Sequence, residues 1–128
     1  GPGGIREIEF LTQGFQLIHT GAQQWPWERS TLPALSWIAS QGYLHDDEAA
    51  DLHDAYLFLR DLENRIQITS GHQTHEIPSD PYDRAVLARM MGIQGRSIDD
   101  SADLLLSRYS VHTGRVQRIY ERIFHTAL

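Results

Sequence analysis

The chain has 128 residues and a formal net charge of −6, because 17 acidic side chains outnumber 11 basic ones, all of them arginine. Its length is sufficient for one domain with one hydrophobic core, and its 41% of hydrophobic residues argues against a disordered chain. The acidic balance argues against nucleic acid as a partner. The absence of lysine and cysteine excludes a lysine-containing phosphate loop, Schiff-base chemistry, disulfides and thiolate zinc sites. No apolar run approaches the roughly 20 residues that span a membrane, so we expect a cytoplasmic protein with no membrane partner.

Apolar residues at alternating three- and four-residue steps predict a helix over residues 5–20. A second helix is expected to begin at Ser30 or Thr31, and Gly42 has the position of a left-handed C-terminal cap. The connector before it contains Trp25-Pro-Trp27, which either covers one end of a bundle or forms a docking feature. The expected buried residues of the two helices are Ile8, Leu11, Phe15 and Ile18, then Leu32, Leu35, Trp37 and Ile38.

Three further helices are expected in the rest of the chain. Acidic residues, favourable at the positive end of a helix dipole, open a third and longer helix over residues 46–69. Asp80 and Pro81 are typical of an N-cap followed by a first-turn proline, and they begin a short helix that ends at Gly92. The last helix covers roughly residues 97–126. The expected buried residues of the third and last helices are Leu52, Ala55, Tyr56, Leu59, Leu62 and Ile66, then Ile98, Ala102, Leu105, Tyr109, Val116, Ile119, Ile123 and Phe124.

Five helices with short connections predict an all-α fold, a four- to five-helix bundle. Charge is distributed unevenly along it, since residues 45–65 hold seven acids against two arginines, whereas residues 101–128 hold four arginines against two acids. We therefore expect the third and last helices to lie side by side with complementary charges.

Two clusters resemble metal sites. His72, His75 and Glu76 lie in an expected loop, where their spacing does not fix their geometry and ordinary hydrogen bonding explains them. The third helix begins with an acidic patch of five carboxylates, Asp46, Asp47, Glu48, Asp51 and Asp54. Helical spacing places Asp47, Asp51 and Asp54 on one face, where magnesium is conceivable, but a solvated helix terminus explains the patch. We expect no metal site and no complete catalytic set, since no Gly-x-Ser-x-Gly elbow frames a nucleophile.

The start of the first helix is unusual for a purely structural segment. Gly3-Gly4 is followed by three charged residues within four positions, and Arg6 near the N-terminus opposes the helix dipole. Helical spacing places Arg6, Glu9 and Gln13 on one side, away from the apolar residues of this helix. The spacing alone is explained equally well by an exposed polar face and by a contact site.

Three segments follow one another in the chain: residues 3–10 (GGIREIEF, with Gln13 and Gln16-Leu17 after them), 55–67 (AYLFLRDLENRIQ) and 73–78 (QTHEIP). Together they resemble the helical domain of bacterial glutamine-synthetase adenylyltransferases, over residues 3–92. The last helix fits this domain by its pattern only. The residues of these segments are more similar to the helical domain that follows the N-terminal, adenylyl-removing half of the enzyme. A related helical domain of the PII uridylyltransferase is the alternative.

The resemblance implies a role in bacterial nitrogen metabolism. Enzymes of this family attach AMP to a tyrosine of glutamine synthetase, using ATP and magnesium, and remove it by phosphorolysis. A helical domain follows each of their nucleotidyltransferase domains. The implied partners are therefore the preceding nucleotidyltransferase domain and glutamine synthetase, with the PII protein and glutamine as candidate effectors.

The family's catalytic signature, a Gly-Ser turn followed by an Asp-x-Asp pair that holds magnesium, is absent from the sequence. We therefore expect residues 1–128 to form a single helical domain of a larger enzyme and to catalyse nothing alone. Gly1-Pro2 fits either a cloning remnant or the natural sequence before the first motif.

The resemblance also favours a contact role for the start of the first helix. Arg6, Glu7, Glu9 and Gln13 are expected to contact a nucleotide or a neighbouring domain. A second polar surface is expected at Arg60, Glu63, Asn64 and Arg65, although pairing within the helix explains much of it. The expected function is that of a linker and regulatory domain. The alternatives are a domain that completes the neighbouring nucleotide site through Arg6 and Glu9, and a free-standing adaptor.

Overall fold

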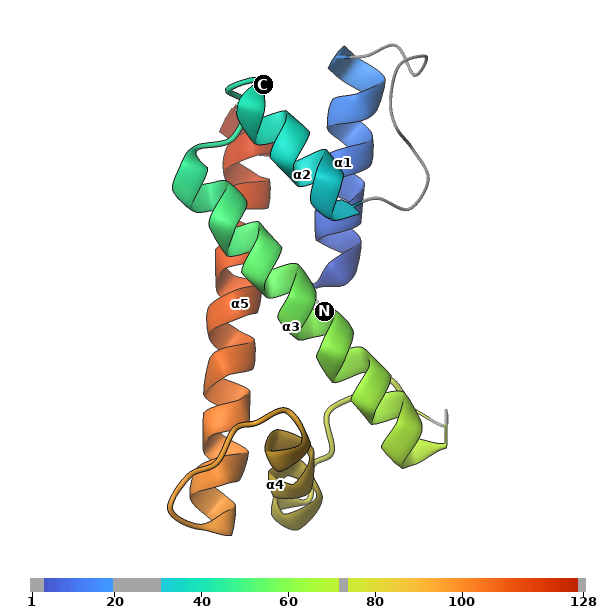
Figure 1. The fold of residues 1–128 in the computed structure, drawn as a ribbon, viewed down its shortest axis with the longest axis vertical. Coiled ribbons are helices and arrows are strands. Elements are labelled where there is room, and N and C mark those ends of the chain that lie inside the picture. The colour runs from blue at the N-terminus through green and yellow to red at the C-terminus, as the bar shows by residue number, and fades with distance from the viewer. Residues whose placement is uncertain (1–3, 20–30, 72–73, 127–128) are drawn as a thin grey trace. The chain divides into compact units, whose positions relative to one another are not determined.

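The computed structural model describes residues 4–19, 31–71 and 74–126. In these ranges the chain forms five helices and no strand, which confirms the all-α fold class (Figure 1). They are α1 (Ile5–His19), α2 (Thr31–Ser40), α3 (Asp46–Ser70), α4 (Pro81–Met90) and α5 (Ile98–Thr126). None of the helices in this described part is long and apolar enough to cross a membrane.

Glycines end helices where the sequence predicts it. Gly42 and Gly92 adopt φ values of 84° and 77°, a region that side chains with a Cβ rarely enter. After Gly92, the Ile93 N–H donates to the carbonyl of Ala88 at 2.9 Å, and the corresponding bond follows Gly42. These bonds satisfy carbonyls at the helix end that have no partner within the helix, so both helices stop at positions set by local sequence.

Side-chain caps begin the later helices. The Asp80 carboxylate accepts the N–H of Asp83 at 3.1 Å, with Pro81 in the first turn, as predicted. Ser97 Oγ accepts the N–H of Asp100 at 3.0 Å in the same way. The starts of α4 and α5 are therefore also encoded locally.

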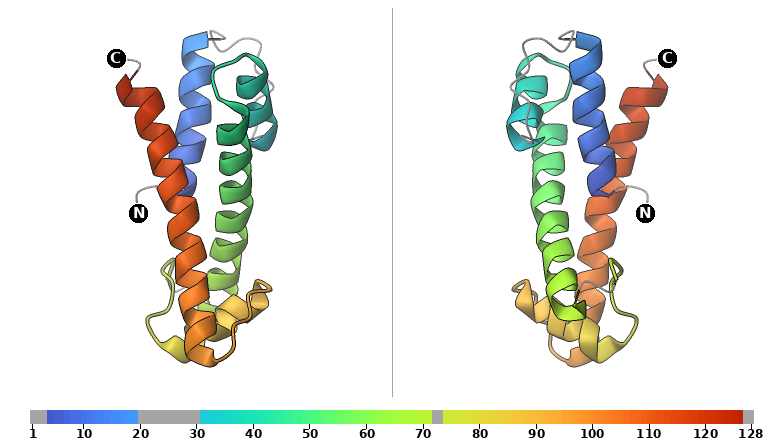
Figure 2. Two further views of the ribbon diagram at one scale, coloured as in Figure 1. Left: turned by 90° about the vertical axis from the view of Figure 1, so that its left-hand side faces the viewer. Right: turned by 90° about the vertical axis from the view of Figure 1, so that its right-hand side faces the viewer.

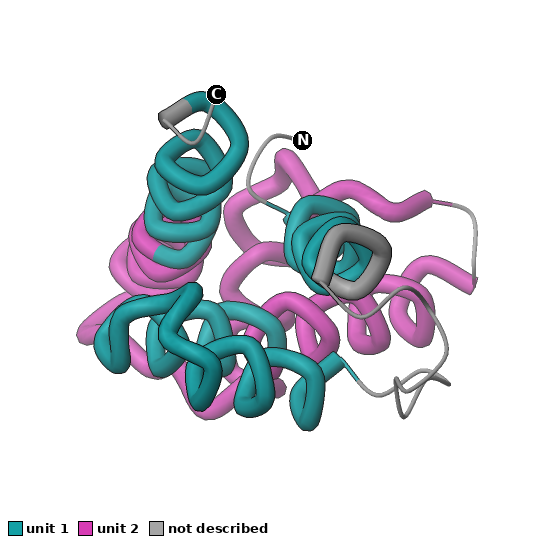
Figure 3. Tube along the Cα trace, turned by 90° about the horizontal axis from the view of Figure 1, so that it is seen from above, with its two compact units in different colours: residues 1–56, 112–128 teal, residues 57–111 magenta. Residues whose placement is uncertain are grey.

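The contacts divide the chain into two compact units (Figure 3): unit 1 consists of residues 1–56 and 112–128, and unit 2 of residues 57–111. Both α3 and α5 contribute residues to each unit. The expectation of a single domain stays a prediction.

In unit 1, α2 packs against α1, and the C-terminal part of α5 runs beside α1 (Figure 2). The rings of Phe10 and Phe124 have centroids 6.2 Å apart. A Cβ added at Gly14 would lie 3.1 Å from Phe124 Cζ, so glycine permits this close approach. Expected buried residues of α1 are confirmed, whereas the Ile18 side chain lies outside the described atoms. The buried apolar residues of unit 1 are Ile8, Leu11, Phe15, Ala34, Leu35, Ile38, Leu44, Leu52, Ala55, Val116 and Ile119.

In unit 2, the end of α3, the short α4 and the start of α5 enclose a second core. Its buried residues are Leu62, Ile66, Leu87, Ala88, Ile93 and Leu105. Ile98 differs from the expectation, because its side chain is 51% exposed. It is the first residue of α5, one turn before the buried Ala102, and the core does not extend to it.

Candidate functional site

The first three turns of α1 carry the four side chains that the sequence singles out, Arg6, Glu7, Glu9 and Gln13. Arg6 and Gln13 are exposed and Glu9 is half-buried, whereas Ile8 and Leu11 on the opposite side are fully buried. The predicted separation of a polar from an apolar face is therefore confirmed. Whether this polar face binds a nucleotide or a neighbouring domain stays a prediction.

Glu7 has a structural role in the same turn. Its Oε2 accepts the N–H of Gly4 at 3.1 Å, which satisfies a donor at the helix start. A carboxylate in the first turn also interacts favourably with the positive end of the helix dipole. Glu7 therefore stabilises the start of α1 and holds Arg6 in a defined helical position.

Phe10 belongs to this face, and sequence reasoning missed it. Its side chain is 57% exposed, although it contacts Tyr120 and Phe124 with centroids 6.4 and 6.2 Å away. The sequence spacing could have identified Phe10, because positions 6, 10 and 13 lie on the same side of a helix. The contact face of α1 is therefore defined here as Arg6, Glu9, Phe10 and Gln13: two charges, an amide and an aromatic ring.

The second polar surface lies on the part of α3 that belongs to unit 2. Arg60 and Glu63 approach to 3.6 Å, and Arg65 Nε donates to Asp61 at 2.9 Å. Asn64 is exposed beside them. Pairs at these spacings stabilise a helix by about 0.2–0.5 kcal/mol each, so intrahelical pairing explains the arginines here.

The acidic start of α3 is partly engaged by α5 within unit 1. Arg122 holds the Glu48 carboxylate with both ends of its guanidinium, Nε to Oε2 at 2.6 Å and a terminal nitrogen to Oε1 at 2.5 Å. Arg115 and Asp51 form a longer pair at 3.8 Å. The expected pairing of the third and last helices through complementary charge is confirmed in unit 1.

The pair changes the acidity of Glu48. Burial raises the pKa of the Glu48 carboxyl, but the hydrogen bonds from Arg122 and the His45 N–H, together with the charge of Arg122, outweigh it. The pKa of Glu48 therefore lies below its ordinary value. A lowered pKa keeps this carboxylate charged at neutral pH, as a structural ion pair requires.

Among the described residues, no group of three or more His, Asp or Glu side chains is placed so that it could hold a metal ion. His75 lies beside Gln67, with His75 Nδ1 and Gln67 Nε2 3.3 Å apart, while His72 lies outside the described residues. Asp47 and Asp54 are exposed to solvent. Trp25 and Trp27 also lie outside the described ranges.

Comparison with known proteins matches almost the whole chain. The family profile described as GlnD PII-uridylyltransferase matches residues 1–124. This chain belongs to that family. It is also similar over all 128 residues to the bifunctional glutamine synthetase adenylyltransferase/adenylyl-removing enzyme of Streptomyces coelicolor, at 38% identity. The enzyme of the same description from Streptomyces avermitilis is 36% identical over the same length.

These relatives are much longer than the chain. The 128 residues cover 12% of each of the two enzymes, about one eighth of their length. The resemblance expected from the three segments is therefore confirmed: the chain is a helical domain of the kind found in these bifunctional enzymes.

Proposed function

We propose that this helical domain is a linker and regulatory domain that supports reversible adenylylation of glutamine synthetase. The observation that carries the proposal is the similarity of the whole chain to one eighth of the bifunctional Streptomyces enzymes. A domain of this kind acts beside a nucleotidyltransferase domain, which would bind ATP and magnesium. Glutamine and the PII protein are the candidate signals.

The contact face of α1 is where we propose that the neighbouring domain is engaged. Its charged, amide and aromatic groups lie on one side of one helix, and Glu7 and Gly4 fix the helix start. Arginine and large aromatic side chains are enriched at protein contacts, because they combine wide apolar surface with directional bonds. A preorganised helix presents them at little cost in conformational entropy.

The test uses the longer enzyme that contains this domain, with Arg6→Ala compared with a matched control, Arg118→Ala, on the exposed side of α5. Adenylylation and deadenylylation of glutamine synthetase are measured with and without glutamine and PII. A linker and regulatory role predicts that Arg6→Ala reduces the response to these effectors several-fold, while the control keeps it. An unchanged response in Arg6→Ala and in a further Phe10→Ser variant would refute a role for this face.

One observation supports a second role, completion of the neighbouring nucleotide site. Arg6 is exposed beside the half-buried Glu9, and a guanidinium in such a position can hold a phosphate. That role predicts a fall of tenfold or more in deadenylylation without effectors for Arg6→Ala, by analogy with other transition-state contacts. A basal rate close to that of the control would exclude it.

A further inference from the structure

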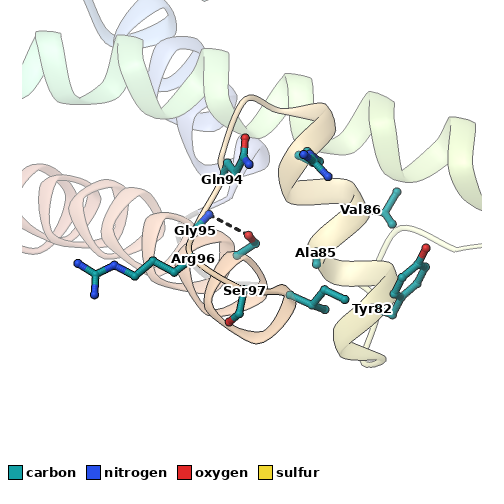
Figure 4. A pocket seen from close by; sticks show the side chains of 10 residues that line it. Tyr82, Ala85, Val86, Gln94, Gly95, Arg96 and Ser97 are labelled. Atoms are coloured by element: carbon teal, nitrogen blue, oxygen red, sulfur yellow. Dashed lines mark hydrogen bonds between the residues drawn. The ribbon is translucent and has the colours of Figure 1, made fainter.

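Unit 2 contains a groove of about 430 Å³ between α4 and the segment that leads into α5 (Figure 4). This volume lies within the range of roughly 300–1,000 Å³ that is usual for ligand sites. Its lining consists of Tyr82, Ala85, Val86 and Arg89 from α4, with residues 94–98 and Ser101 on the other side. The residues of the groove belong to unit 2, whereas those of the contact face of α1 belong to unit 1.

Hydrogen bonds fix the wall formed by the connecting segment. The N–H of Gly95 donates to Ser101 Oγ at 2.8 Å, the bond drawn in Figure 4, and the N–H of Arg96 donates to Asp100 Oδ2 at 2.7 Å. Ile93 anchors the same segment in the core with 1% of its side chain exposed. The wall is therefore formed in advance, and a ligand need not order it on binding.

Three large apolar side chains line the groove and remain exposed. Tyr82 is 60% exposed, Ile98 51% and Val86 41%. Single exposed apolar residues are normal on protein surfaces, but a group of them around one depression is typical of an interaction site. The core of unit 2 does not use these side chains, so they are available to a partner.

The two charged side chains that line the groove, Arg89 and Arg96, are both positive. Both are exposed, and neither forms an ion pair with another residue in the described ranges. In Figure 4 the Arg96 side chain extends away from α4. Asp99 and Asp103 are exposed on α5 but do not line the groove. The lining is therefore positive in a chain whose net charge is −6.

We propose that this groove binds a segment of a partner protein in which carboxylates flank one large apolar side chain. The apolar side chain would contact Tyr82, Val86 and Ile98, and the carboxylates would pair with Arg89 and Arg96. Exposed aliphatic groups favour an apolar side chain over a nucleotide base, which prefers an aromatic face on each side. Tyrosine and arginine are also the residue types enriched where proteins meet.

The probe is a displayed library of random dodecapeptides, selected on the full 128-residue chain. We expect enrichment of peptides with Leu, Ile, Met or Phe near two or more acidic residues. Fluorescence anisotropy then measures the binding of a selected peptide to the wild type and to two double variants, Val86→Ser with Ile98→Ser and Arg89→Gln with Arg96→Gln. We expect each double variant to bind the peptide roughly tenfold more weakly than the wild type, or weaker still. Raising the salt from about 0.05 M to about 0.5 M weakens binding to the wild type and much less to the arginine variant.

Two matched controls lie in the same unit outside the groove. Leu57, 48% exposed, is changed to Ser, and the exposed Arg108 is changed to Gln, with binding expected to stay within about twofold. All substituted side chains are exposed, and circular dichroism checks that each variant folds. In NMR titrations of the wild type, the largest shifts are expected at Tyr82, Val86 and Gly95.

Several results would overturn the proposal. One is a selection in which peptides with apolar and acidic residues are not enriched. Another is peptide binding that weakens as much in the control variants as in the groove variants. A third is NMR shifts on peptide binding that lie outside the groove. Shifts at Tyr82 and Val86 caused by ATP with magnesium, and competition of ATP with the peptide, would make this a nucleotide site instead. None of these results depends on the proposed regulatory role, which is measured on other residues.

Discussion

The ion pair between Glu48 and Arg122 joins two helices across 74 positions of sequence, and its removal tests how unit 1 is held together. Glu48 is 12% exposed and Arg122 40% exposed. Hydrogen bonds to charged groups contribute roughly 1.5–3 kcal/mol each when they are shielded from water. The exposure of Arg122 weakens them through solvent screening. For Glu48→Gln we therefore expect a loss of about 1–2 kcal/mol near neutral pH, or about 4–8 °C in Tm.

The loss of unfolding free energy in Glu48→Gln is expected to become smaller as the pH falls. The pKa of Glu48 in the folded chain lies below its ordinary value of 4.5, so the charged carboxylate stabilises the fold above that value. This stabilisation is lost as the pH falls through the lower, folded pKa. The difference in unfolding free energy between the wild type and Glu48→Gln is therefore constant near neutral pH and shrinks below about pH 4.5.

Urea unfolding followed by circular dichroism measures the loss of unfolding free energy and its dependence on pH. A double-mutant cycle of Glu48→Gln with Arg122→Gln gives the coupling energy between the two side chains. The matched control is the cycle of Asp51→Asn with Arg115→Gln, whose charged atoms are 3.8 Å apart and whose side chains are 36% and 39% exposed. For that control we expect a coupling below about 0.5 kcal/mol. Equal couplings in the two cycles, or a cost of Glu48→Gln that persists in acid, would refute the reasoning.

Two further predictions concern the helix starts of unit 2. Asp80→Ala removes the acceptor for the N–H of Asp83 and should lower the free energy of unfolding by about 1 kcal/mol. Asp80→Asn keeps an acceptor and should lower it much less. Equal urea midpoints for these two variants would contradict a role for Asp80 as a cap. In Gly95→Ala the new Cβ would lie 2.3 Å from Asp100 Oδ2 and 2.9 Å from the Asp100 carbonyl carbon, so we expect a loss of roughly 1–3 kcal/mol. Gly14→Ala, which meets only a movable ring edge, is the comparison in thermal melts and should lose less.

The sequence by itself determined the helices and their ends. Asp80 and Pro81 begin α4, and Gly42 and Gly92 end α2 and α4, because caps act within a few residues of the chain. The buried faces of α1 and most of α3 also followed from spacing, since a helix repeats its faces at fixed intervals. The resemblance to glutamine-synthetase adenylyltransferases followed from three short segments, and the similarity of all 128 residues to the two Streptomyces enzymes, together with the profile match over residues 1–124, confirmed it.

Only the tertiary structure decided which side chains meet. The sequence indicated charge complementarity between two helices, but not that Glu48 would be the acid held by Arg122. It placed Ile98 in the core, whereas the fold leaves it beside Tyr82 in the groove of unit 2. Burial and pairing depend on how helices pack after they form, and residues far apart in sequence have no local signal for it. Helix ends are set within a single turn, and for that reason they could be predicted.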